Sequence, residues 1–493
     1  MKRYNSLIPI FWSDKDGSKT VKLAFVGFYR LIGLCSLLLV LPTFSFAAQS
    51  SFYVSPNGKN TNSGTLSSPW KTLSFAVSKL SAGNTLYVRG GIYAETVWIG
   101  NSGTTTQPIV ITAYSGEYPV IDGSGLIVKN WNSLIEINGA YVQISGFELR
   151  NMNLNGAVAG GFGLNMQGVG DTASNMLVHD IWSQPILLQN DNEVLRNSTV
   201  YRGALMNCRL STATACGVRT NKYNQNLGWP GCVGIVKSYN SGLINKNSTI
   251  QGVTVHDCWG EGISTFNSTG AIIEDNVSYN NFSENLYVNN AVHALVQRNI
   301  VYNAPDSYLG SYAPVAGFAL ADEQNNSLPT LASNLGEYNT VINNFILNSS
   351  VSLYGWTEVV GTGLNNVIFA NNTIINSNFS TGFGGTDIIT NNNTSIVNNI
   401  ISGGKVFVPS ALGLTFSSNL WLTTPPATAQ GTQIVIGDPK LAATGQTGAG
   451  QLSAGYFKLL SSSKAIGKGI PLSQVTTNFF GVPVTNPPNI GGD

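Results

Sequence analysis

The sequence predicts an all-β protein whose body is a right-handed parallel β-helix, a single-stranded solenoid with a short capping helix at its N-terminal end. Three observations predict this fold. A short phrase recurs about every 24 residues, no helical periodicity lies between its copies, and the composition is rich in turn formers. With 54 glycines and only 10% charged residues, the chain suits short strands joined by tight turns better than long helices.

The repeated phrase is an Asn or Gly, then alternating apolar residues, then a polar turn. Its marker positions are Gly146, Asn175, Asn197, Gly252, Asn276, Asn299, Asn344, Asn372, Asn399 and Asn419. Successive markers lie 29, 22, 55, 24, 23, 45, 28, 27 and 20 residues apart, so two intervals are roughly doubled and either hide a coil or carry loops. A strand-built repeat of this length predicts a solenoid, whereas a β-propeller needs a period of about 40.

The marker Asn has a physical role in this prediction. At the bend between two strands Asn tolerates left-handed backbone conformations, and its side chain can bond the equivalent Asn one coil away. A surface turn residue would explain the abundance of Asn, but not its fixed offset from the apolar pair. We therefore expect an internal ladder of Asn side chains.

The chain divides into four predicted segments. They are a signal peptide (1–47), an N-terminal cap (48–84), the parallel β-helix (85–425) and a C-terminal cap segment (426–493). Caps are expected because the open ends of a β-stack expose strand edges. The Asn phrase disappears in the last segment, which is predicted to cover that end.

The first segment carries scattered Lys and Arg, the apolar run LIGLCSLLLVLP and then Ser45-Phe46-Ala47, a small-residue pattern typical of a signal-peptidase site. The alternative is a retained single-span anchor over residues 23–46. Either interpretation predicts export, to a secreted or periplasmic location. Once the leader is cut, no membrane attachment is expected.

The N-terminal cap is predicted to contain a short helix. Ser68-Pro69 reads as an N-cap followed by Pro at the first helical position, and Leu73, Val77 and Leu80 mark one apolar face. This helix would plug the first coil.

Four cysteines remain after the leader, an even number in a compartment that permits disulfides: Cys208, Cys216, Cys232 and Cys258. Pairing cannot be deduced from the sequence. Spacing favours Cys208 with Cys216, closing a short loop, and Cys232 with Cys258, about one coil apart. The absence of a CxxC pattern argues for a structural role.

The charge balance excludes one class of partner. Lys+Arg 25 against Asp+Glu 24 gives a net charge of +1, which supplies no field to attract nucleic acid. We expect a monomer that binds no nucleic acid.

Two segments resemble a known family. FYVSPNGKNTNSGTLSSPWKTLSFAVSKLSAGNTLYVRGGIYAE resembles the N-terminal segment of secreted β-helix proteins of the pectate-lyase-like superfamily, and GDPKLAATGQTGAGQLSAGYFKLLSSSKAIGKGI resembles a C-terminal segment found in the same group. The resemblance implies a polysaccharide partner. It leaves the reaction open, since the superfamily holds lyases, hydrolases, epimerases, esterases and coils without known catalysis.

Two motifs of the superfamily are missing from the chain. The resemblance would imply a calcium-binding cluster of aspartates with a nearby Lys or Arg as base if the protein were a pectate lyase, and no matching cluster is found. The HD of LVHDI and TVHDC does not extend to the DPHD of alginate epimerases.

Aligning the coils by their markers brings two acids together. Glu261 and Glu284 fall in one column, and neighbouring strands lie about 4.8 Å apart. Like charges so placed raise one pKa or recruit a cation. A Glu beside a turn Gly is by itself more often solvated or bonded to backbone, so the column is the informative feature.

The surrounding coils supply further candidates for three roles. The catalytic candidates are Glu261, Glu284, His256, Lys237 and Tyr287. The substrate-binding candidates are Trp259, Trp229, Asn289 and Arg202. If the protein uses a cofactor, calcium is the one expected, and its candidate ligands are Asp257, Asp322 and Glu323.

Three functions fit this patch, with a lyase slightly ahead of a hydrolase. In a lyase, a cation or protonated carboxyl neutralises a uronate while Lys237, Arg202, His256 or Tyr287 removes a proton. In a glycoside hydrolase, two carboxyls flank the bond. In a non-catalytic binding or surface-structural solenoid, aromatic rings stack on sugars and the acids hold calcium.

One charged pair is assigned no chemistry. Asp275 and Arg298 share a column, and opposite charges there most simply form a cross-coil salt bridge.

Overall fold

The fold is known from a computed structural model, which describes residues 50–126, 132–152, 161–208, 229–237, 243–310, 316–323, 336–357, 363–382 and 390–493. The predicted signal peptide lies outside these residues. No helix in the described ranges is long and apolar enough to cross a membrane, since α1 (Leu73–Val77) has five residues.

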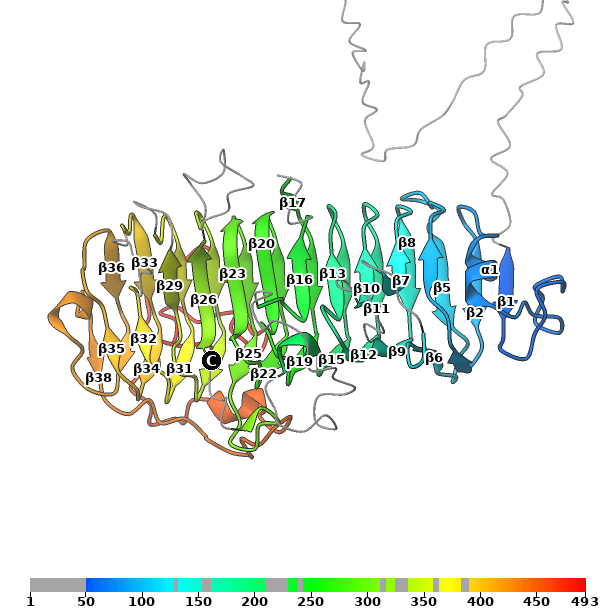
Figure 1. The fold of residues 1–493 in the computed structure, drawn as a ribbon. Helices are drawn as coiled ribbons and strands as arrows, with labels where there is room; N and C mark the ends of the chain where they lie inside the picture. The colour runs from blue at the N-terminus through cyan, green and yellow to red at the C-terminus, as the bar shows by residue number, and fades with distance from the viewer. Residues whose placement is uncertain are drawn as a thin grey trace, which may run out of the picture. The chain divides into compact units, whose positions relative to one another are not determined.

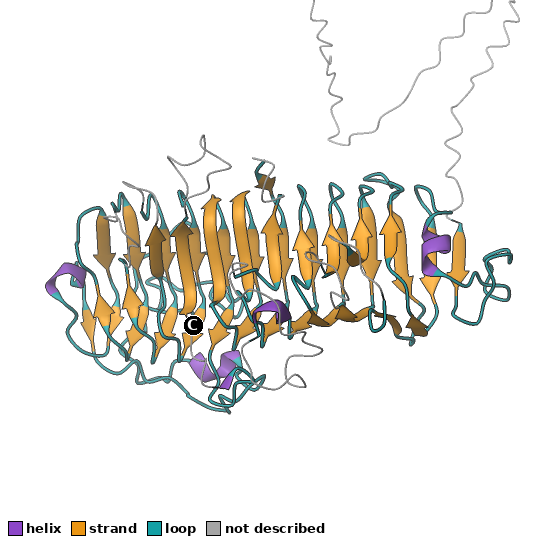
Figure 2. Ribbon diagram, in the orientation of Figure 1, coloured by secondary structure: helices purple, strands orange, loops and turns teal. Residues whose placement is uncertain are grey.

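The described residues form the predicted parallel β-helix, in which each coil contributes a strand to up to three long sheets (Figures 1 and 2). Sheet 1 consists of β1 (Ser51–Val54), β2 (Thr85–Val88), β5 (Ile109–Ala113), β8 (Val142–Ser145), β11 (Thr172–Ser174), β14 (Val194–Arg196), β18 (Thr249–Gln251), β21 (Ile272–Glu274), β24 (Leu295–Gln297), β27 (Thr340–Ile342), β30 (Ile368–Ala370), β33 (Thr394–Val397) and β36 (Leu414–Ser417). All of its strand pairs are parallel, as a solenoid requires.

Sheet 2 follows sheet 1 in each coil after a short bend. It consists of β3 (Gly91–Tyr93), β6 (Pro119–Asp122), β9 (Glu148–Met152), β12 (Leu177–Ile181), β15 (Thr199–Tyr201), β19 (Thr254–His256), β22 (Val277–Tyr279), β25 (Ile300–Tyr302), β28 (Phe345–Leu347), β31 (Thr373–Ile375), β34 (Ile400–Ser402), β37 (Leu420–Trp421) and β38 (Val435–Ile436). Its last strand extends the stack beyond residue 425, where the β-helix was predicted to end.

Sheet 3 completes most of the coils and carries the longest strands. It consists of β4 (Val97–Ile99), β7 (Ser133–Ile137), β10 (Phe162–Met166), β13 (Ile186–Leu188), β16 (Val233–Val236), β17 (Asn245–Lys246), β20 (Ile263–Thr269), β23 (Glu284–Val292), β26 (Ala316–Asp322) and β29 (Tyr354–Thr357). The short strands β32 (Phe379–Ser380) and β35 (Val406–Phe407) pair with each other.

The core is built from stacked columns of inward-facing side chains. In sheet 1 one column runs through Ile111, Ile144, Ala173, Leu195, Ile250, Ile273, Val296, Val341, Phe369, Ile396 and Phe416, all of them buried. Burying one large aliphatic side chain contributes about 1.5–3 kcal/mol, so each coil is stabilised mainly by contact with its neighbours.

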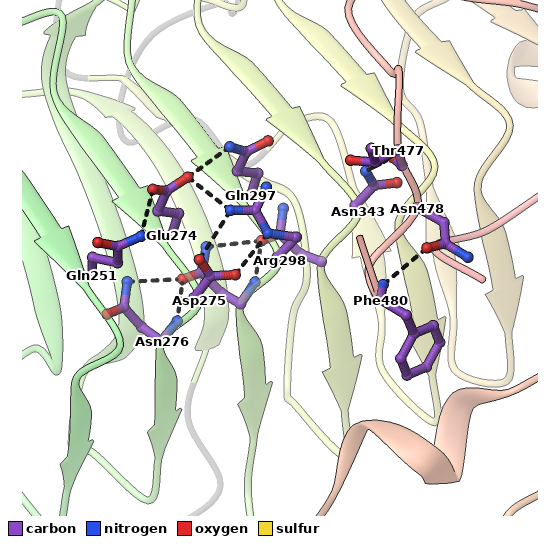
Figure 3. A network of polar contacts seen from close by, with 12 residues as sticks. Gln251, Glu274, Asp275, Asn276, Gln297, Arg298, Asn343, Thr477, Asn478 and Phe480 are labelled. Atoms are coloured by element: carbon purple, nitrogen blue, oxygen red, sulfur yellow. Dashed lines mark hydrogen bonds and ion pairs between the residues drawn. The ribbon is translucent and has the colours of Figure 1, made fainter. Parts of the chain in front are cut away.

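The Asn ladder is confirmed over the C-terminal half of the stack. Each Asn side-chain NH2 group donates to the side-chain oxygen of the Asn one coil further along. These bonds are 2.9 Å long from Asn276 to Asn299, from Asn299 to Asn344 and from Asn344 to Asn372. The pattern continues at 3.0 Å from Asn372 to the side-chain oxygen of Asn399, and from Asn399 to that of Asn419. Figure 3 shows Asn276 beside the polar network on the adjoining surface.

One part of the ladder prediction is wrong, because one residue does not perform both expected roles. The left-handed residue is the one before the ladder Asn: Asp275 has φ 59° and Arg298 has φ 53°. In earlier coils Asn197 and Gly252 occupy this left-handed position, and the ladder position after Gly252 is held by the buried Val253. The predicted marker series therefore slips by one residue after Gly252.

Neither doubled interval adds a hidden coil to sheet 1. Val194 pairs directly with Thr249, and Leu295 pairs directly with Thr340. One turn of the stack therefore takes 55 and 45 residues at these two places.

The capping helix is shorter than predicted and starts later. Thr72 precedes α1, whose Leu73 and Ser74 backbone N–H groups donate to the carboxylate of Glu95 at 2.8 and 3.0 Å. Ser68 does not cap a helix, because its backbone N–H closes a turn onto the Thr65 carbonyl oxygen at 3.1 Å. The helix still buries its apolar side against the first strands.

The C-terminal segment covers the outer side of sheet 2 as well as following the last coil. Phe345 of β28 stacks on Phe457 and Phe479, with ring centroids 4.3 and 4.1 Å apart. Further along, the Asn398 side chain donates to the Ile470 carbonyl oxygen and accepts from the Ile470 N–H. Figure 1 shows this orange and red segment running back along the coils.

The pair Asp275 and Arg298 forms the predicted cross-coil salt bridge (Figure 3). The Arg298 guanidinium donates to both oxygens of Asp275, at 2.7 and 2.9 Å, and to Glu274 at 2.9 Å.

Candidate functional site

The predicted contact between Glu261 and Glu284 is confirmed. Ile263 of β20 pairs with Leu286 of β23, so the two glutamates lie level on adjacent coils. The Gly262 N–H donates to the Glu284 carbonyl oxygen at 2.8 Å. Both side chains are partly exposed at the start of sheet 3.

The predicted Cys232–Cys258 disulfide is confirmed and supports this region. It joins the residue before β16 to the turn that leads to Glu261. The Cys232 N–H also donates to the Glu261 carbonyl oxygen at 2.9 Å. The other predicted pair includes Cys216, which lies outside the described residues.

The local environment favours protonation of both glutamates. Burial, then the charge of Glu284, raises the pKa of Glu261 well above its usual range, although a hydrogen bond with Ser264 opposes this. Burial, then the charge of Glu323, raises the pKa of Glu284 to about 7, although a hydrogen bond from Ser283 opposes it. At neutral pH this pair therefore holds protons that exposed glutamates would have released.

Glu323 is the third acid of the cluster and has a different environment. It follows β26, and its two carboxylate oxygens accept hydrogen bonds from the Tyr287 hydroxyl at 2.7 Å and the Asn289 amide at 2.8 Å. The Asn289 side-chain oxygen in turn accepts from the Glu323 N–H at 3.2 Å. Two donors from β23 therefore fix the orientation of the Glu323 carboxyl group.

These groups make one coupled site, which we call the acidic cluster: Glu261, Glu284, Glu323, Tyr287 and Asn289. Burial raises the pKa of Tyr287 well above its usual range, and the charges of Glu323, Glu261 and Glu284 add to the shift. Glu323 contacts the phenol directly, whereas Glu261 precedes β20 and Glu284 begins β23, on adjacent coils of the same sheet.

Sequence reasoning placed Glu323 among metal ligands and missed Ser264 and Ser283. Ser264 pairs in register with Tyr287, and Ser283 directly precedes Glu284, so both stood in the coils that carried the glutamate column. Their place in these coils could have pointed to them, but serine is so common in this chain that its position alone does not indicate a site residue.

Two of the candidate bases lie apart from the acidic cluster. Lys237 follows β16, where its ammonium contacts the Asp191 carboxylate at 2.9 Å; β16 pairs with β20, but Lys237 lies past the end of its strand whereas Glu261 precedes the start of β20. Arg202 follows β15 of sheet 2, where its guanidinium pairs with Asp180 at 2.6 Å.

His256 also lies on sheet 2, in an aromatic stack that the sequence did not reveal. The rings of His179, Tyr201, His256, Tyr279 and Tyr302 follow one another at centroid distances of 4.7, 5.1, 4.7 and 4.9 Å. Stacking on both faces fixes the His256 ring, so only its edge is open to solvent.

The candidate calcium ligands are not brought together. Asp257 bonds His256 at 2.7 Å on the sheet 2 side, whereas Asp322 and Glu323 follow one another at the end of β26. Asp322 is buried and its pKa is raised to about 8, first by burial and then by the charge of Glu337. Within the described ranges, no group of three or more His, Cys, Asp or Glu side chains forms a metal-ligand set.

The two candidate tryptophans differ in exposure. Trp259 is fully buried, packed with Leu205, Met206 and Leu309, so it cannot offer a face to a sugar as predicted. Trp229 is 39% exposed and packs on Phe282, which lies beside the Ser283–Glu284 pair, with ring centroids 4.8 Å apart. Trp229 is therefore the aromatic candidate that remains accessible.

Part of the chain matches a described protein family. Residues 52–209 match the model of the Pel9A-like, right handed beta helix region. A solved structure described as a complex of XylC with xylose has the same fold at a TM-score of 0.53, with 10% identity over 90% of this chain and 98% of that one. At that identity the likeness shows the fold alone.

Three curated relatives match shorter stretches. Pectate lyase PEL9 of Emericella nidulans is 42% identical over 79 residues, and pectate lyase L of Paenibacillus polymyxa is 31% identical over 118 residues. The uncharacterized protein YwoF of Bacillus subtilis is 33% identical over 130 residues. These matches cover 16%, 23% and 26% of this chain, and 19%, 26% and 27% of the respective relatives.

Proposed function

We propose that the chain is an exported enzyme of the pectate-lyase-like superfamily that cleaves glycosidic bonds of an extracellular polysaccharide at the acidic cluster, a proposal supported by its parallel β-helix, by the family match over residues 52–209 and by the two pectate lyases among its relatives. The observation that carries the proposal is the unequal environment of its carboxyls. Glu284 retains a proton up to about pH 7, while both oxygens of Glu323 accept hydrogen bonds. We assign protonated Glu284 as the acid, and Glu323, held by its two hydrogen-bond donors, as the partner carboxyl.

The reaction that this arrangement supports best is hydrolysis. Protonated Glu284 donates its proton to the glycosidic oxygen as the C–O bond breaks. The Glu323 carboxylate stabilises the positive charge at the anomeric carbon, and the attacking water gives its hydroxyl to that carbon and its proton to Glu323 or to the Glu284 carboxylate left by the first step. Tyr287 and Asn289 hold Glu323 in position, and the charge of Glu323 adds to the burial that raises the pKa of Glu284.

β-Elimination is the second candidate, because two of the relatives are pectate lyases. In that reaction protonated Glu261 or Glu284 would neutralise the uronate carboxylate, or calcium held by the acidic oxygens would do so. Tyr287 would then have to remove the proton, and because its pKa is raised well above its usual range, its hydroxyl keeps its own proton and is rarely available as a base. The arrangement of charges therefore favours hydrolysis over elimination, whereas the sequence alone put a lyase slightly ahead of a hydrolase.

The test is incubation with pectate, alginate, arabinoxylan and galactan, with and without chelator. New reducing ends report any cleavage, and ultraviolet absorbance of unsaturated uronates reports elimination. We expect new reducing ends without that absorbance. Glu284→Gln and Glu323→Gln should each lower the rate by about 10²–10⁴, the usual contribution of an acid or base.

Glu117→Gln is the matched control. Glu117 pairs with Arg89 in the N-terminal coils, so its charge can be removed without touching the acidic cluster. The proposal is wrong if no polymer is cut, or if both cluster variants cut as fast as the control.

A further inference from the structure

We propose that Trp98 and its neighbours form a second carbohydrate-binding site, remote from the acidic cluster, that holds a distant part of the same polysaccharide. Trp98 is the central residue of β4, and its side chain is 64% exposed between the buried Val97 and Ile99. Exposing the apolar surface of an indole to water is unfavourable in free energy, and a sugar ring stacked on the indole would remove that surface from water.

The indole lies flat on the strand because the second residue after it is glycine. A Cβ built on Gly100 would lie 2.1, 2.5 and 2.7 Å from three carbons of the Trp98 six-membered ring. The ring therefore occupies the space of the missing side chain. One face is held against the backbone, and the other is available as a fixed platform.

Polar side chains border this platform on the next coils. Trp98 pairs in register with the partly exposed Glu136, and the Ile99–Ile137 pair places Gly100 level with Asn138. The Asn138 amide donates to the side-chain oxygen of Gln167 at 2.7 Å. An aromatic face flanked by amide and carboxylate groups matches a pyranose, which offers an apolar C–H face and a rim of hydroxyls.

The platform belongs to the same sheet as the acidic cluster but is a separate patch. Six successive strand pairs in register connect Trp98 to Tyr287, which at about 4.8 Å each places them roughly 29 Å apart. Between them Leu187 and Val236 are buried with Phe162. A long polymer can reach both patches, whereas a short oligosaccharide can occupy only one.

Simultaneous binding at two patches raises the affinity for long chains without any new contact at either one. Trp98 should therefore affect long substrates and leave short ones alone. This inference rests on the proposed polysaccharide substrate, but not on the reaction at the acidic cluster.

The test is binding of the same four soluble polysaccharides by affinity electrophoresis, with the full chain in a Glu284→Gln background so that cleavage cannot interfere. We expect Trp98→Ala to weaken binding of the preferred polymer about tenfold or more, and Trp98→Phe to weaken it less. Gly100→Ala should also weaken it, because the added Cβ displaces the ring while the tryptophan remains.

Tyr118→Ala is the control, since Tyr118 is 80% exposed and carries no such platform. Unchanged polymer binding in Trp98→Ala, equal losses in the control, or no binding by the parent would each overturn the platform. If the native protein cleaves a polymer but Trp98→Ala does not change binding, the Trp98 site is wrong and the proposed function stands. If binding depends on Trp98 but no polymer is cleaved, the Trp98 site stands and the proposed function is wrong.

Discussion

The Asn ladder offers a stability prediction that can be worked bond by bond at Asn344. Its side-chain oxygen accepts from the backbone N–H and the amide of Asn299 at 3.0 and 2.9 Å. Its own amide donates to the Val296 carbonyl oxygen at 3.0 Å and to Asn372 at 2.9 Å. Asn344→Ala removes all of these bonds from a site that is 3% exposed.

The cost follows from the groups left behind. The substitution strands the Asn299 N–H and amide and the Val296 carbonyl in the core, and each unsatisfied buried group costs about 1–3 kcal/mol. Some of this is recovered when neighbours shift or a water enters the space. We expect Asn344→Ala to destabilise the protein by about 3–5 kcal/mol.

The assay is urea unfolding of the protein, together with hydrogen exchange of the segment around Asn299. Asn392→Ala is the matched control, because the exposed Asn392 side chain makes one cross-coil hydrogen bond, to Asn365 at 3.1 Å. Its cost should stay within about 0.5 kcal/mol. Equal costs for the two variants, or unchanged exchange at Asn299, would refute the reasoning that the ladder is an energetic element of the fold.

Three further predictions follow from other parts of the fold. Reducing the Cys232–Cys258 disulfide, or replacing both residues by Ser, should lower stability by about 2–4 kcal/mol in thermal unfolding, and an unchanged melting temperature would contradict this. The cleavage rate should fall with a one-proton slope above about pH 7, as Glu284 loses its proton. Because the pKa of Glu284 is raised in the folded protein, the free energy of unfolding should fall as the pH rises from about 4.5 to about 7. Glu284→Gln should therefore melt at a higher temperature than the parent at pH 8 but not at pH 4. Phe345→Ala should lower the free energy of unfolding by about 3–5 kcal/mol and expose the C-terminal segment to limited proteolysis, because the Phe345 ring packs on Phe457. A proteolysis pattern like that of the parent would show that this contact does not hold the C-terminal segment on sheet 2.

Periodicity carried most of what the sequence could predict. Stacked coils, the glutamate pair at Glu261 and Glu284 and the Cys232–Cys258 disulfide all follow from counting residues round one turn. The one-residue slip after Gly252 arose because Asn is favoured both at a left-handed bend and in a buried ladder, two positions that are adjacent in the chain.

The errors at the site come from contacts that spacing does not encode. Trp259 was expected to face a sugar, but inserted segments such as that around Leu205 and Met206 pack over it. Glu323 was grouped with Asp322, although successive residues at the end of a strand point to opposite sides of the sheet. The hydrogen bond that its carboxyl accepts from the Tyr287 hydroxyl depends on how closely β23 and β26 lie, which only the structure gives.

The most direct test of the central claim is to run the cleavage in water enriched in heavy oxygen and to weigh the products. If the acidic cluster hydrolyses the glycosidic bond, each cut adds one water and the label appears at the new reducing end. If the products instead lack the added water and carry a double bond, the bond is broken by elimination and the acid–base assignment of Glu284 and Glu323 is contradicted.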